Sequence, residues 1–146
     1  MLSSTLEHYL LVIYVSKLNQ EEITCRDIAK KLNQPIKQVM QAVQRLHYQK
    51  YIDYSTYQPI EINDNGIRFA NYLITRDRIV EQFLIILDIT ENMQMEKETI
   101  CQYLSQDTLM KMEQFVLFAI SNPQFVREYK LFLQANKESI LLKYLS

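Results

Sequence analysis

The order of the segments in the first sixty residues is the feature that most constrains how this chain can fold. Apolar residues recur at helical spacing in STLEHYLLVIY, in CRDIAKKL and in the segment after Pro35. A segment rich in Tyr and Ile, YIDYSTYQPIEIN, follows and is broken at Gln58-Pro59, which is typical of two short strands joined by a turn. Three helices followed by a hairpin are the order of a winged helix-turn-helix.

Polar residues mark the starts of these three predicted helices. Ser4 and Glu7 fit a capping box for the first helix, and Thr24 and Asp27 repeat the signal for the second. Pro35 suits the first turn of the third helix, where a backbone N–H is not needed. The buried stripe of that third helix is predicted to consist of Ile36, Val39, Met40, Val43 and Leu46.

The second half of the chain is predicted to be entirely helical. A helical pattern without a breaker runs from Asn63 through IRFANYLITRDRIVEQFLIILDI, and two shorter helices are expected around residues 95–105 and 107–120. A last amphipathic helix is expected to run from Pro123 to the end, with Phe125, Tyr129, Phe132, Leu133, Ile140, Leu141 and Tyr144 on its apolar face.

These patterns predict a mainly α protein with two parts. Residues 1–63 form an N-terminal winged helix-turn-helix with a two-stranded wing, and residues 64–146 form an all-helical dimerisation domain. The second part offers more apolar helical faces than one small lobe can cover. Homodimerisation is therefore the expected way to bury them.

The composition argues against an enzyme. Gly66 is the only glycine, which excludes phosphate-cradling loops, the dinucleotide fingerprint and the nucleophile elbow. Two histidines, His8 and His47, cannot build a three-histidine metal site. Cys101 and His8 could be paired as nucleophile and base, but neither has a local motif beside it, so no catalytic residue is predicted.

The expected location is the cytoplasm, with no membrane partner. No apolar run reaches the roughly 20 residues that span a bilayer, and the start of the chain lacks the charged region and cleavage site of a signal peptide. Cys25 and Cys101 are accordingly expected to be free thiols or metal ligands rather than a disulfide.

Charge is unevenly distributed along a chain whose net charge is -1. Residues 24–50 contain six Lys and Arg side chains against Asp27 alone, which gives this segment +5 and leaves -6 for the remainder. A local positive field suits a small DNA-reading module, because counterion release depends on where the basic groups lie. The alternative is an ordinary solvated helix face.

The third predicted helix carries the candidate DNA-reading side chains on the face opposite its apolar stripe. Gln can contact adenine with two hydrogen bonds, and Lys can reach guanine or a phosphate. Thr24 and Arg26, near the start of the second helix, are candidate phosphate contacts, and Tyr57 at the wing tip is a weaker one. The candidate DNA-contacting residues of the third helix are Lys37, Gln38, Gln41 and Gln44, with Arg45 toward the flank. The first three are favoured for base contacts, because residues near a helix N-terminus usually touch bases. The alternative function is a winged-helix protein-interaction module that does not read DNA.

The chain resembles the diphtheria toxin repressor family, and within it the short manganese-dependent regulators. The resemblance covers about residues 3–120 and is carried, in the family's order and spacing, by STLEHYLLVIY, DIAKKL, VMQAVQRL, YIDY, TRDRIVEQFLIIL and, less clearly, ICQYLS. It implies a homodimeric transcriptional repressor that binds a double-stranded DNA operator. It leaves no room for the third, SH3-like domain of the longer members.

The resemblance also implies a divalent metal ion held between the first helix, the long linking helix and the helix after it. At the ligand positions of the first helix this chain has His8 and Leu11, and Leu11 has no donor atom. In the linking helix the family's His becomes Asp77, while Glu81 keeps a carboxylate used by the longer members. The third element carries Glu98, Cys101 and Gln102 in place of a Glu-x-x-Glu-His or Cys-x-x-Glu-His motif.

Two interpretations of this changed ligand set remain open. Leu11 and Gln102 remove two ligands, so the two-manganese site of the regulators is lost. In one interpretation His8, Asp77, Glu98 and Cys101 form an altered site for one divalent ion such as Zn(II), Mn(II), Fe(II) or Co(II). In the other the site is vestigial, no metal binds, and Cys101 packs as a small buried apolar residue.

Overall fold

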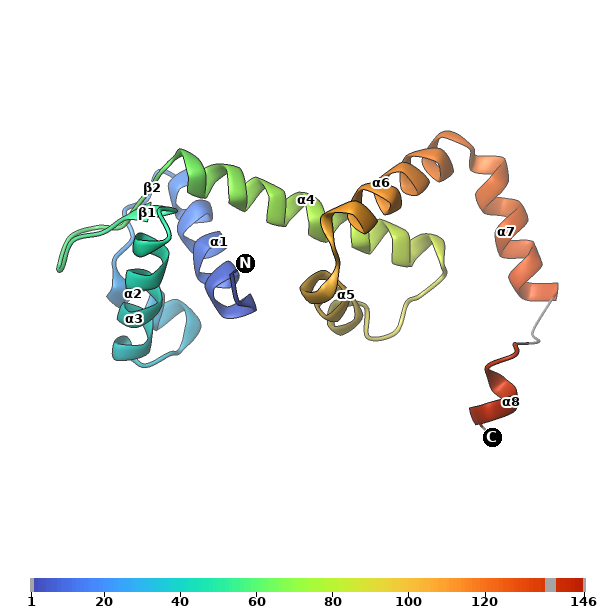
Figure 1. The fold of residues 1–146 in the computed structure, drawn as a ribbon, viewed down its shortest axis with the longest axis horizontal. Helices are drawn as coiled ribbons and strands as arrows, with labels where there is room; N and C mark the ends of the chain where they lie inside the picture. Colours follow the sequence, from blue (N-terminus) through green and yellow to red (C-terminus); the bar gives the residue numbers. More distant parts are fainter. Residues whose placement is uncertain (1, 136–138, 146) are drawn as a thin grey trace. The chain divides into compact units, whose positions relative to one another are not determined.

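The computed structural model describes residues 2–135 and 139–145 (Figure 1). The chain divides into two compact units, Met1–Thr75 and Arg76–Ser146, which part within one long helix. The boundary expected from the sequence, after residue 63, stays a prediction. Within the described residues, no helix is long and apolar enough to cross a membrane.

The first unit is the predicted series of three helices followed by a hairpin. Its two strands pair antiparallel, with Ile52 opposite Ile62 and Asp53 opposite Glu61. The long linking helix begins two residues after the second strand. The elements are α1 (Ser4–Leu18), α2 (Cys25–Leu32), α3 (Ile36–Tyr48), β1 (Ile52–Asp53), β2 (Glu61–Ile62) and the first half of α4 (Asp64–Ile86). The predicted mainly α fold with a two-stranded wing is therefore confirmed.

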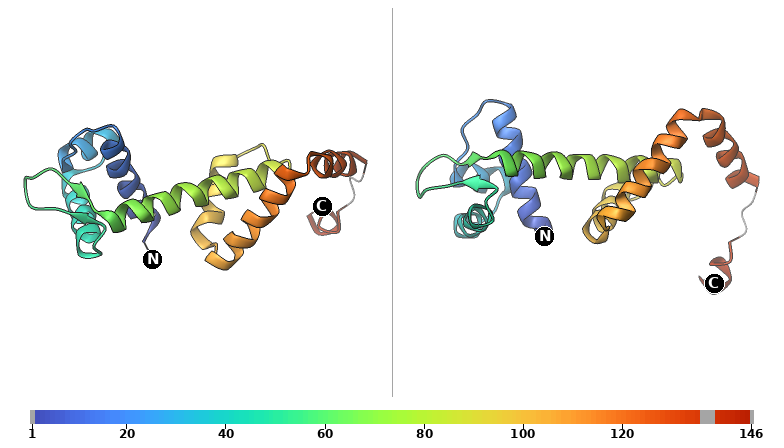
Figure 2. Two further views of the ribbon diagram at one scale, coloured as in Figure 1. Left: turned by 90° about the horizontal axis from the view of Figure 1, so that it is seen from above. Right: turned by 45° about the horizontal axis from the view of Figure 1, so that its top comes forward.

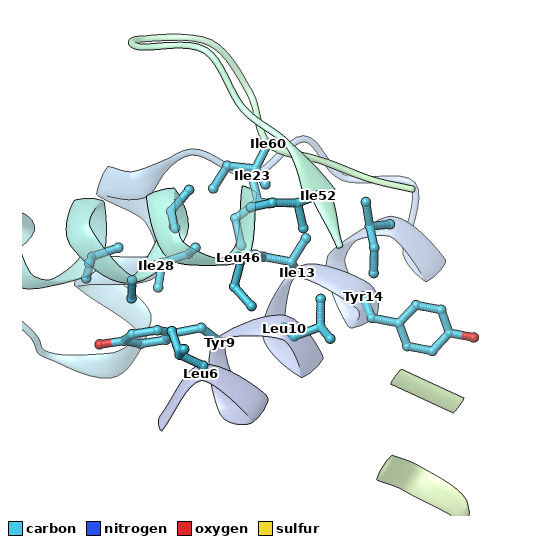
Figure 3. Close-up of a cluster of buried hydrophobic side chains, with 14 of the residues drawn as sticks. Leu6, Tyr9, Leu10, Ile13, Tyr14, Ile23, Ile28, Leu46, Ile52 and Ile60 are labelled. Atoms are coloured by element: carbon cyan, nitrogen blue, oxygen red, sulfur yellow. The ribbon is translucent and has the colours of Figure 1, made fainter. Parts of the chain in front are cut away.

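One apolar core holds the first unit together. Side chains from α1, from α3 and from the two strands converge on it (Figure 3). Burying a Leu, Ile or Val side chain completely stabilises a fold by roughly 1.5–3 kcal/mol, so a few such positions dominate its stability. In the described part of the first unit, the apolar side chains with no exposed surface are Leu10, Ile28, Val39, Val43 and Leu46, together with Ala70 from α4.

The predicted stripe of α3 is correct at its centre and wrong at its start. Val39, Val43 and Leu46 are buried as expected. Ile36 is 43% exposed, because it is the first residue of α3 and lies at the turn rather than over the core. Ala42 is buried in addition, next to Val43 on the same side of the helix.

Two helix caps were predicted, and one is shifted. Thr24 and Asp27 form the predicted capping box: the Asp27 N–H donates to Oγ1 of Thr24 at 3.3 Å, and the Thr24 N–H donates to Oδ2 of Asp27 at 2.8 Å. The cap of α1 is Ser3 rather than Ser4, since Oγ of Ser3 accepts from the N–H of Leu6 at 3.3 Å. Ser3 keeps an extended backbone, which leaves Ser4 as the first helical residue.

The turn between α2 and α3 is tight. Asn33 ends α2 in the left-handed conformation with φ of 50°, and its N–H donates to the carbonyl oxygens of Ala29 and Lys30. Asn tolerates this conformation better than most side chains. Pro35 then caps α3 with an extended backbone. Only three residues join the two helices, which contact each other directly.

The second unit is built around the remaining part of α4. Ile86, Val116 and Ala119 form a buried apolar cluster, and Phe83 and Phe115 pack against it. The rings of these two phenylalanines contact each other edge to face. Helices α6 and α7 contact each other, and Figure 2 shows them following one another at an angle. Besides α4, the elements are α5 (Met93–Tyr103), α6 (Gln106–Ser121), α7 (Pro123–Ala135) and α8 (Leu142–Leu145).

The prediction of a single helix from Pro123 to the end of the chain was wrong. Helix α7 ends at Ala135, and the separate short helix α8 begins at Leu142. Ser139 contributes to the break, because its Oγ accepts from the N–H of Leu141 at 3.2 Å. A Ser side chain bonded to nearby backbone in this way competes with a continuing helix.

Candidate nucleic-acid interface and candidate metal centre

The outer face of α3 presents the predicted base-reading side chains to solvent. Lys37, Gln41 and Gln44 follow one another at intervals of four and three residues, so they share one side of the helix. All five predicted residues, Lys37, Gln38, Gln41, Gln44 and Arg45, are exposed. Their polar groups are therefore free of the core and can reach a partner surface.

Tyr48 belongs to the same face and was missed by the sequence analysis. Its side chain is 80% exposed at the end of α3. Its place on this face could have been predicted from the helical spacing, because Tyr48 lies four residues after Gln44 and seven after Gln41. A Tyr at this place can add a hydrogen-bonding hydroxyl to a surface that contacts phosphates.

The start of α2 is already occupied by its own cap. The Thr24 hydroxyl donates to Oδ2 of Asp27 at 2.9 Å while it accepts from the Asp27 N–H. Hydrogen bonds from the backbone and the hydroxyl of Thr24 hold the pKa of Asp27 below its usual value. A carboxylate at this helix start competes with a phosphate for the same N–H groups. Arg26, which is exposed, is the stronger candidate for a phosphate contact.

The wing is anchored at its base and open at its tip. The Tyr54 N–H donates to Nδ1 of His47 at 3.2 Å, which ties the start of the tip to α3. Burial, followed by the hydrogen bond with Cys25, raises the pKa of Tyr54 to about 12, so its hydroxyl stays protonated. Tyr57 is 91% exposed and has a positive φ of 65°. Tyr57 can thus reach a partner, but the tip carries no Lys or Arg.

The candidate metal ligands are divided between the two units. His8 is exposed on α1 in the first unit. Asp77 and the neighbouring carboxylate of Glu81 lie on α4, while Glu98 and Cys101 lie on α5, all in the second unit. The geometry of the second unit determines what the α4 and α5 positions can hold.

Lys97 on α5 reaches both carboxylates of α4. Its Nζ lies 2.9 Å from Oδ2 of Asp77 and 3.4 Å from Oε2 of Glu81. Burial opposes the charge of this ammonium, but the hydrogen bonds and charges of Asp77 and Glu81 outweigh it and raise the pKa of Lys97. Lys97 is therefore a fixed positive charge at neutral pH.

The side chains of Glu98 and Cys101 do not face the same site, although the two residues are three positions apart in the sequence. Glu98 is exposed and accepts a hydrogen bond from Nε2 of Gln94 at 2.7 Å. Cys101 is buried, and its thiol donates to Oδ1 of Asp77 at 3.9 Å. Burial raises the pKa of Cys101, whereas a metal ligand must be a thiolate. The turn of α5 directs Lys97, not Glu98, toward α4.

These side chains do not fit a divalent cation in the second unit. Asp77 uses one oxygen for Lys97 and the other for Cys101, and Glu81 is also paired with Lys97. Among the residues that the structure describes, no three His, Cys, Asp or Glu side chains gather into a possible metal site. The role of Lys97 was not predicted from the sequence. The position of this residue four residues before Cys101, on the same side of α5, was the available signal.

Comparison with known proteins gives matches across most of the chain. Residues 1–60 match the family model described as "Iron dependent repressor, N-terminal DNA binding domain". The HTH-type transcriptional regulator MntR of Lysinibacillus sphaericus is 25% identical over 134 residues, which cover 91% of this chain and 94% of the relative. The protein of the same name from Oceanobacillus iheyensis is 23% identical over 137 residues, covering 93% of each chain.

Solved structures share the fold. The manganese regulator SloR aligns with a TM-score of 0.66 at 21% identity over 77% of this chain, and ScaR with bound Zn²⁺ aligns with a TM-score of 0.67 at 22% identity over 76%. The aligned part spans 54% of the SloR chain and 53% of the ScaR chain. A hypothetical protein of Sulfolobus solfataricus aligns at 24% identity with a TM-score of 0.66, covering 79% of this chain and 89% of its own.

Proposed function

Because this chain belongs to the diphtheria toxin repressor family of DNA-binding transcriptional regulators, which are not enzymes, we propose that it is a homodimeric repressor that recognises a specific operator in double-stranded DNA. Helix α3 is the reading element, and dimerisation supplies two such helices for the two halves of an operator. The alternative of a protein-interaction module without DNA binding is not proposed, because the matched model describes a DNA-binding domain.

The observation that carries the proposal is the exposed polar face of α3. In a helix-turn-helix the N-terminal residues of the second helix contact base edges, which assigns base contacts to Lys37, Gln38 and Gln41. Gln44 and Arg45, further along, are assigned to the flanking bases or backbone. The turn at Asn33 and the packing of α2 against α3 fix the direction in which this face points.

The charge of the first unit supports the same function. The +5 segment of residues 24–50 includes α2 and α3, and its Lys and Arg side chains are exposed. Phosphate contacts position a protein on DNA, and base contacts specify the sequence. Arg26 is assigned to the first role, with smaller contributions from Thr24 and from Tyr57 at the wing tip.

Homodimerisation is proposed for the second unit because its last helices leave large apolar side chains in solvent. Large apolar side chains left exposed in this number commonly mark an interface between subunits. The exposed side chains are Met110, Leu117, Phe118 and Ile120 on α6, Leu131 and Phe132 on α7, and Ile140, Leu141, Leu142, Tyr144 and Leu145 in and beside α8.

The test is binding of the purified full chain to its own upstream DNA, followed by fluorescence anisotropy. The double variant Lys37→Ala/Gln41→Ala should lose specific binding and keep its unfolding temperature. Each good base contact is worth about 1–3 kcal/mol, so the loss should be tenfold or more. The control is Lys130→Ala/Gln134→Ala, an exposed Lys and Gln at the same four-residue spacing on α7.

Two outcomes would oppose the proposal. Unchanged affinity of the Lys37→Ala/Gln41→Ala variant would exclude α3 as the reading helix. Equal loss in the Lys130→Ala/Gln134→Ala control would show that the effect is general rather than local. A reporter fused to the bound promoter separates repression from activation, and repression predicts higher expression without the protein.

A further inference from the structure

His47 contacts two backbone groups of the wing through a single ring nitrogen. Its Nδ1 accepts from the Tyr54 N–H at 3.2 Å and lies 3.2 Å from the carbonyl oxygen of Ile52. These two backbone groups flank Asp53, which pairs with Glu61 on the other strand. In an extended strand, the carbonyl before a residue and the N–H after it point to the same edge. His47 therefore caps the edge of β1 that faces α3.

One nitrogen cannot serve both backbone groups at the same time. Without a proton, Nδ1 has a lone pair that accepts from the Tyr54 N–H and has no hydrogen for the Ile52 carbonyl. With a proton, Nδ1 donates to the Ile52 carbonyl oxygen and meets the Tyr54 N–H as one donor facing another. An imidazolium carries a proton on both ring nitrogens. Protonation of His47 therefore always removes the acceptor of the Tyr54 N–H.

The other attachments of the wing do not depend on a proton at His47. The Ile60 N–H donates to the carbonyl oxygen of Ile23 at 2.8 Å, which holds the part of the wing that returns from the tip. The Tyr54 hydroxyl is hydrogen-bonded to Cys25 of α2. Burial raises the pKa of the Cys25 thiol and raises the pKa of Tyr54 to about 12, so both groups stay protonated at neutral pH. In acid the wing should therefore loosen near Tyr54 and remain attached.

The charged groups around α3 keep their charges in the range where an imidazole gains its proton. Helix α3 contacts α1, α2 and β1, which turn Tyr9, Tyr14 and Cys25 inward. Carboxylates, Lys and Arg ordinarily stay charged between pH 5 and 8, whereas His changes its charge there. Besides the exposed His8, the charged side chains of these three elements are the half-buried Glu7 and the exposed Lys17, Arg26, Asp27, Lys30, Lys31 and Asp53. On α3 itself, Lys37, Arg45 and Tyr48 are exposed.

We propose that His47 is a positioning residue for the wing and that its proton controls how firmly the wing is held. The neutral ring binds the Tyr54 N–H, and the protonated ring releases it and binds the Ile52 carbonyl. Tyr57, three residues after Tyr54 and 91% exposed, is then held less firmly at the tip. The consequence for DNA, a tip contact that weakens in acid, rests on the proposed function. The exchange of hydrogen bonds does not.

Nuclear magnetic resonance of the nitrogen-15-labelled full chain, without DNA, tests the exchange of hydrogen bonds. At pH 8, Nδ1 of His47 should carry no proton. Between pH 8 and pH 5.5, the amide proton of Tyr54 should move upfield in step with the His47 ring, because it loses its acceptor. The Gly66 amide is the internal control, since its acceptor, Oδ1 of Asn63 at 3.0 Å, does not titrate.

Two matched variants assign the movement of the Tyr54 amide to one ring. His47→Gln should abolish it, because a Gln side chain offers a carbonyl oxygen to the Tyr54 N–H and does not titrate. His8→Gln removes the other histidine of the chain, which is exposed on α1, and should leave the movement unchanged.

Anisotropy titrations with the upstream DNA test the consequence for the wing. Acid adds positive charge to the chain and favours all DNA, so the comparison is made between two chains at the same pH. The affinity of wild type divided by that of Tyr57→Ala measures the tip contact. This ratio should be about two to ten at pH 8, as for one hydrogen bond, and should fall toward one at pH 5.5. In the His47→Gln background, the ratio should be equal at both pH values.

Three results would overturn the proposal. A proton on Nδ1 of His47 at pH 8 would mean that the neutral ring already binds Ile52. A Tyr54 amide that does not move, or that moves equally in His47→Gln, would show that the His47 proton does not control this bond. A Tyr57→Ala ratio above one that is equal at pH 8 and pH 5.5 would show that the tip contact is independent of His47. A ratio of one at pH 8 would oppose the proposed tip contact instead, and the titration without DNA still decides the exchange of hydrogen bonds.

Discussion

Gly66 lies directly against the carbonyl oxygen of Tyr51, so close that a Cβ atom at position 66 would overlap it. The same Cβ atom would lie 2.6 Å from Cγ1 of Ile62, and the Gly66 N–H is bonded to Oδ1 of Asn63 at 3.0 Å. The only glycine of the chain is thus placed where the wing joins the long helix, and no side chain fits there.

Gly66→Ala should destabilise the first unit severely. The added methyl group meets backbone, which cannot move without breaking the junction, and overpacking of this kind typically costs about 1–3 kcal/mol, with backbone clashes at the upper end. Urea unfolding followed by circular dichroism measures the loss. Arg68→Ala, exposed two residues later on the same helix, is the control and should change stability by only a few tenths of a kcal/mol. A Gly66→Ala chain as stable as wild type would mean that the backbone at Tyr51 can shift to accommodate the methyl group.

The capping box of α2 should make stability depend on pH. The folded-state pKa of Asp27 is lowered, so its contribution is present above the unfolded pKa of about 3.9 and is lost as pH falls through the folded value. Asp27→Asn should therefore be less stable than wild type at pH 7, and this difference should shrink below pH 4. Thr24→Ala should cost about 1 kcal/mol at pH 7. A difference between wild type and Asp27→Asn that is the same at both pH values would contradict the assignment.

Arg26→Ala should weaken binding to all DNA sequences alike. A lost phosphate contact lowers affinity without changing specificity, and it reduces the slope of log K against log salt by about 0.9. Anisotropy titrations at several salt concentrations give that slope. Arg127→Ala, which removes an exposed Arg from α7, should leave it unchanged. If Arg26→Ala alters preference between operators instead, Arg26 reads bases.

If the proposed homodimer forms through the second unit, Leu117→Glu should convert it to a monomer. Leu117 is exposed among the apolar side chains of α6, so a buried Glu would disrupt an interface there while leaving the isolated subunit folded. Light scattering coupled to size exclusion gives the mass. Gln114→Glu adds the same charge at an exposed polar position of α6 and should remain dimeric. A Leu117→Glu chain with the same mass as wild type would contradict an interface at Leu117.

Much of the first unit could be predicted because its signals are local. The capping box joins Thr24 to Asp27 within one turn, and the buried stripe of α3 repeats every three or four residues. Errors came where two neighbouring residues could serve equally, as with Ser3 and Ser4 at the start of α1. The division of the last helical segment was not predicted, because the apolar pattern continues through Ser139, whose Oγ accepts from the N–H of Leu141.

The sequence by itself determined the helix order, the hairpin, the single glycine and the basic segment, since each depends on composition or on residues within one helical turn. Only the tertiary structure decided the fate of the candidate metal ligands. Glu98 and Lys97 are adjacent in the chain, and the packing of α5 exposes the first and buries the second against Asp77, twenty positions away. Which of two adjacent helical residues is buried depends on how the helix packs against the rest of the unit. That packing buries one whole face of the helix, and the contacts that fix it come from residues distant in sequence.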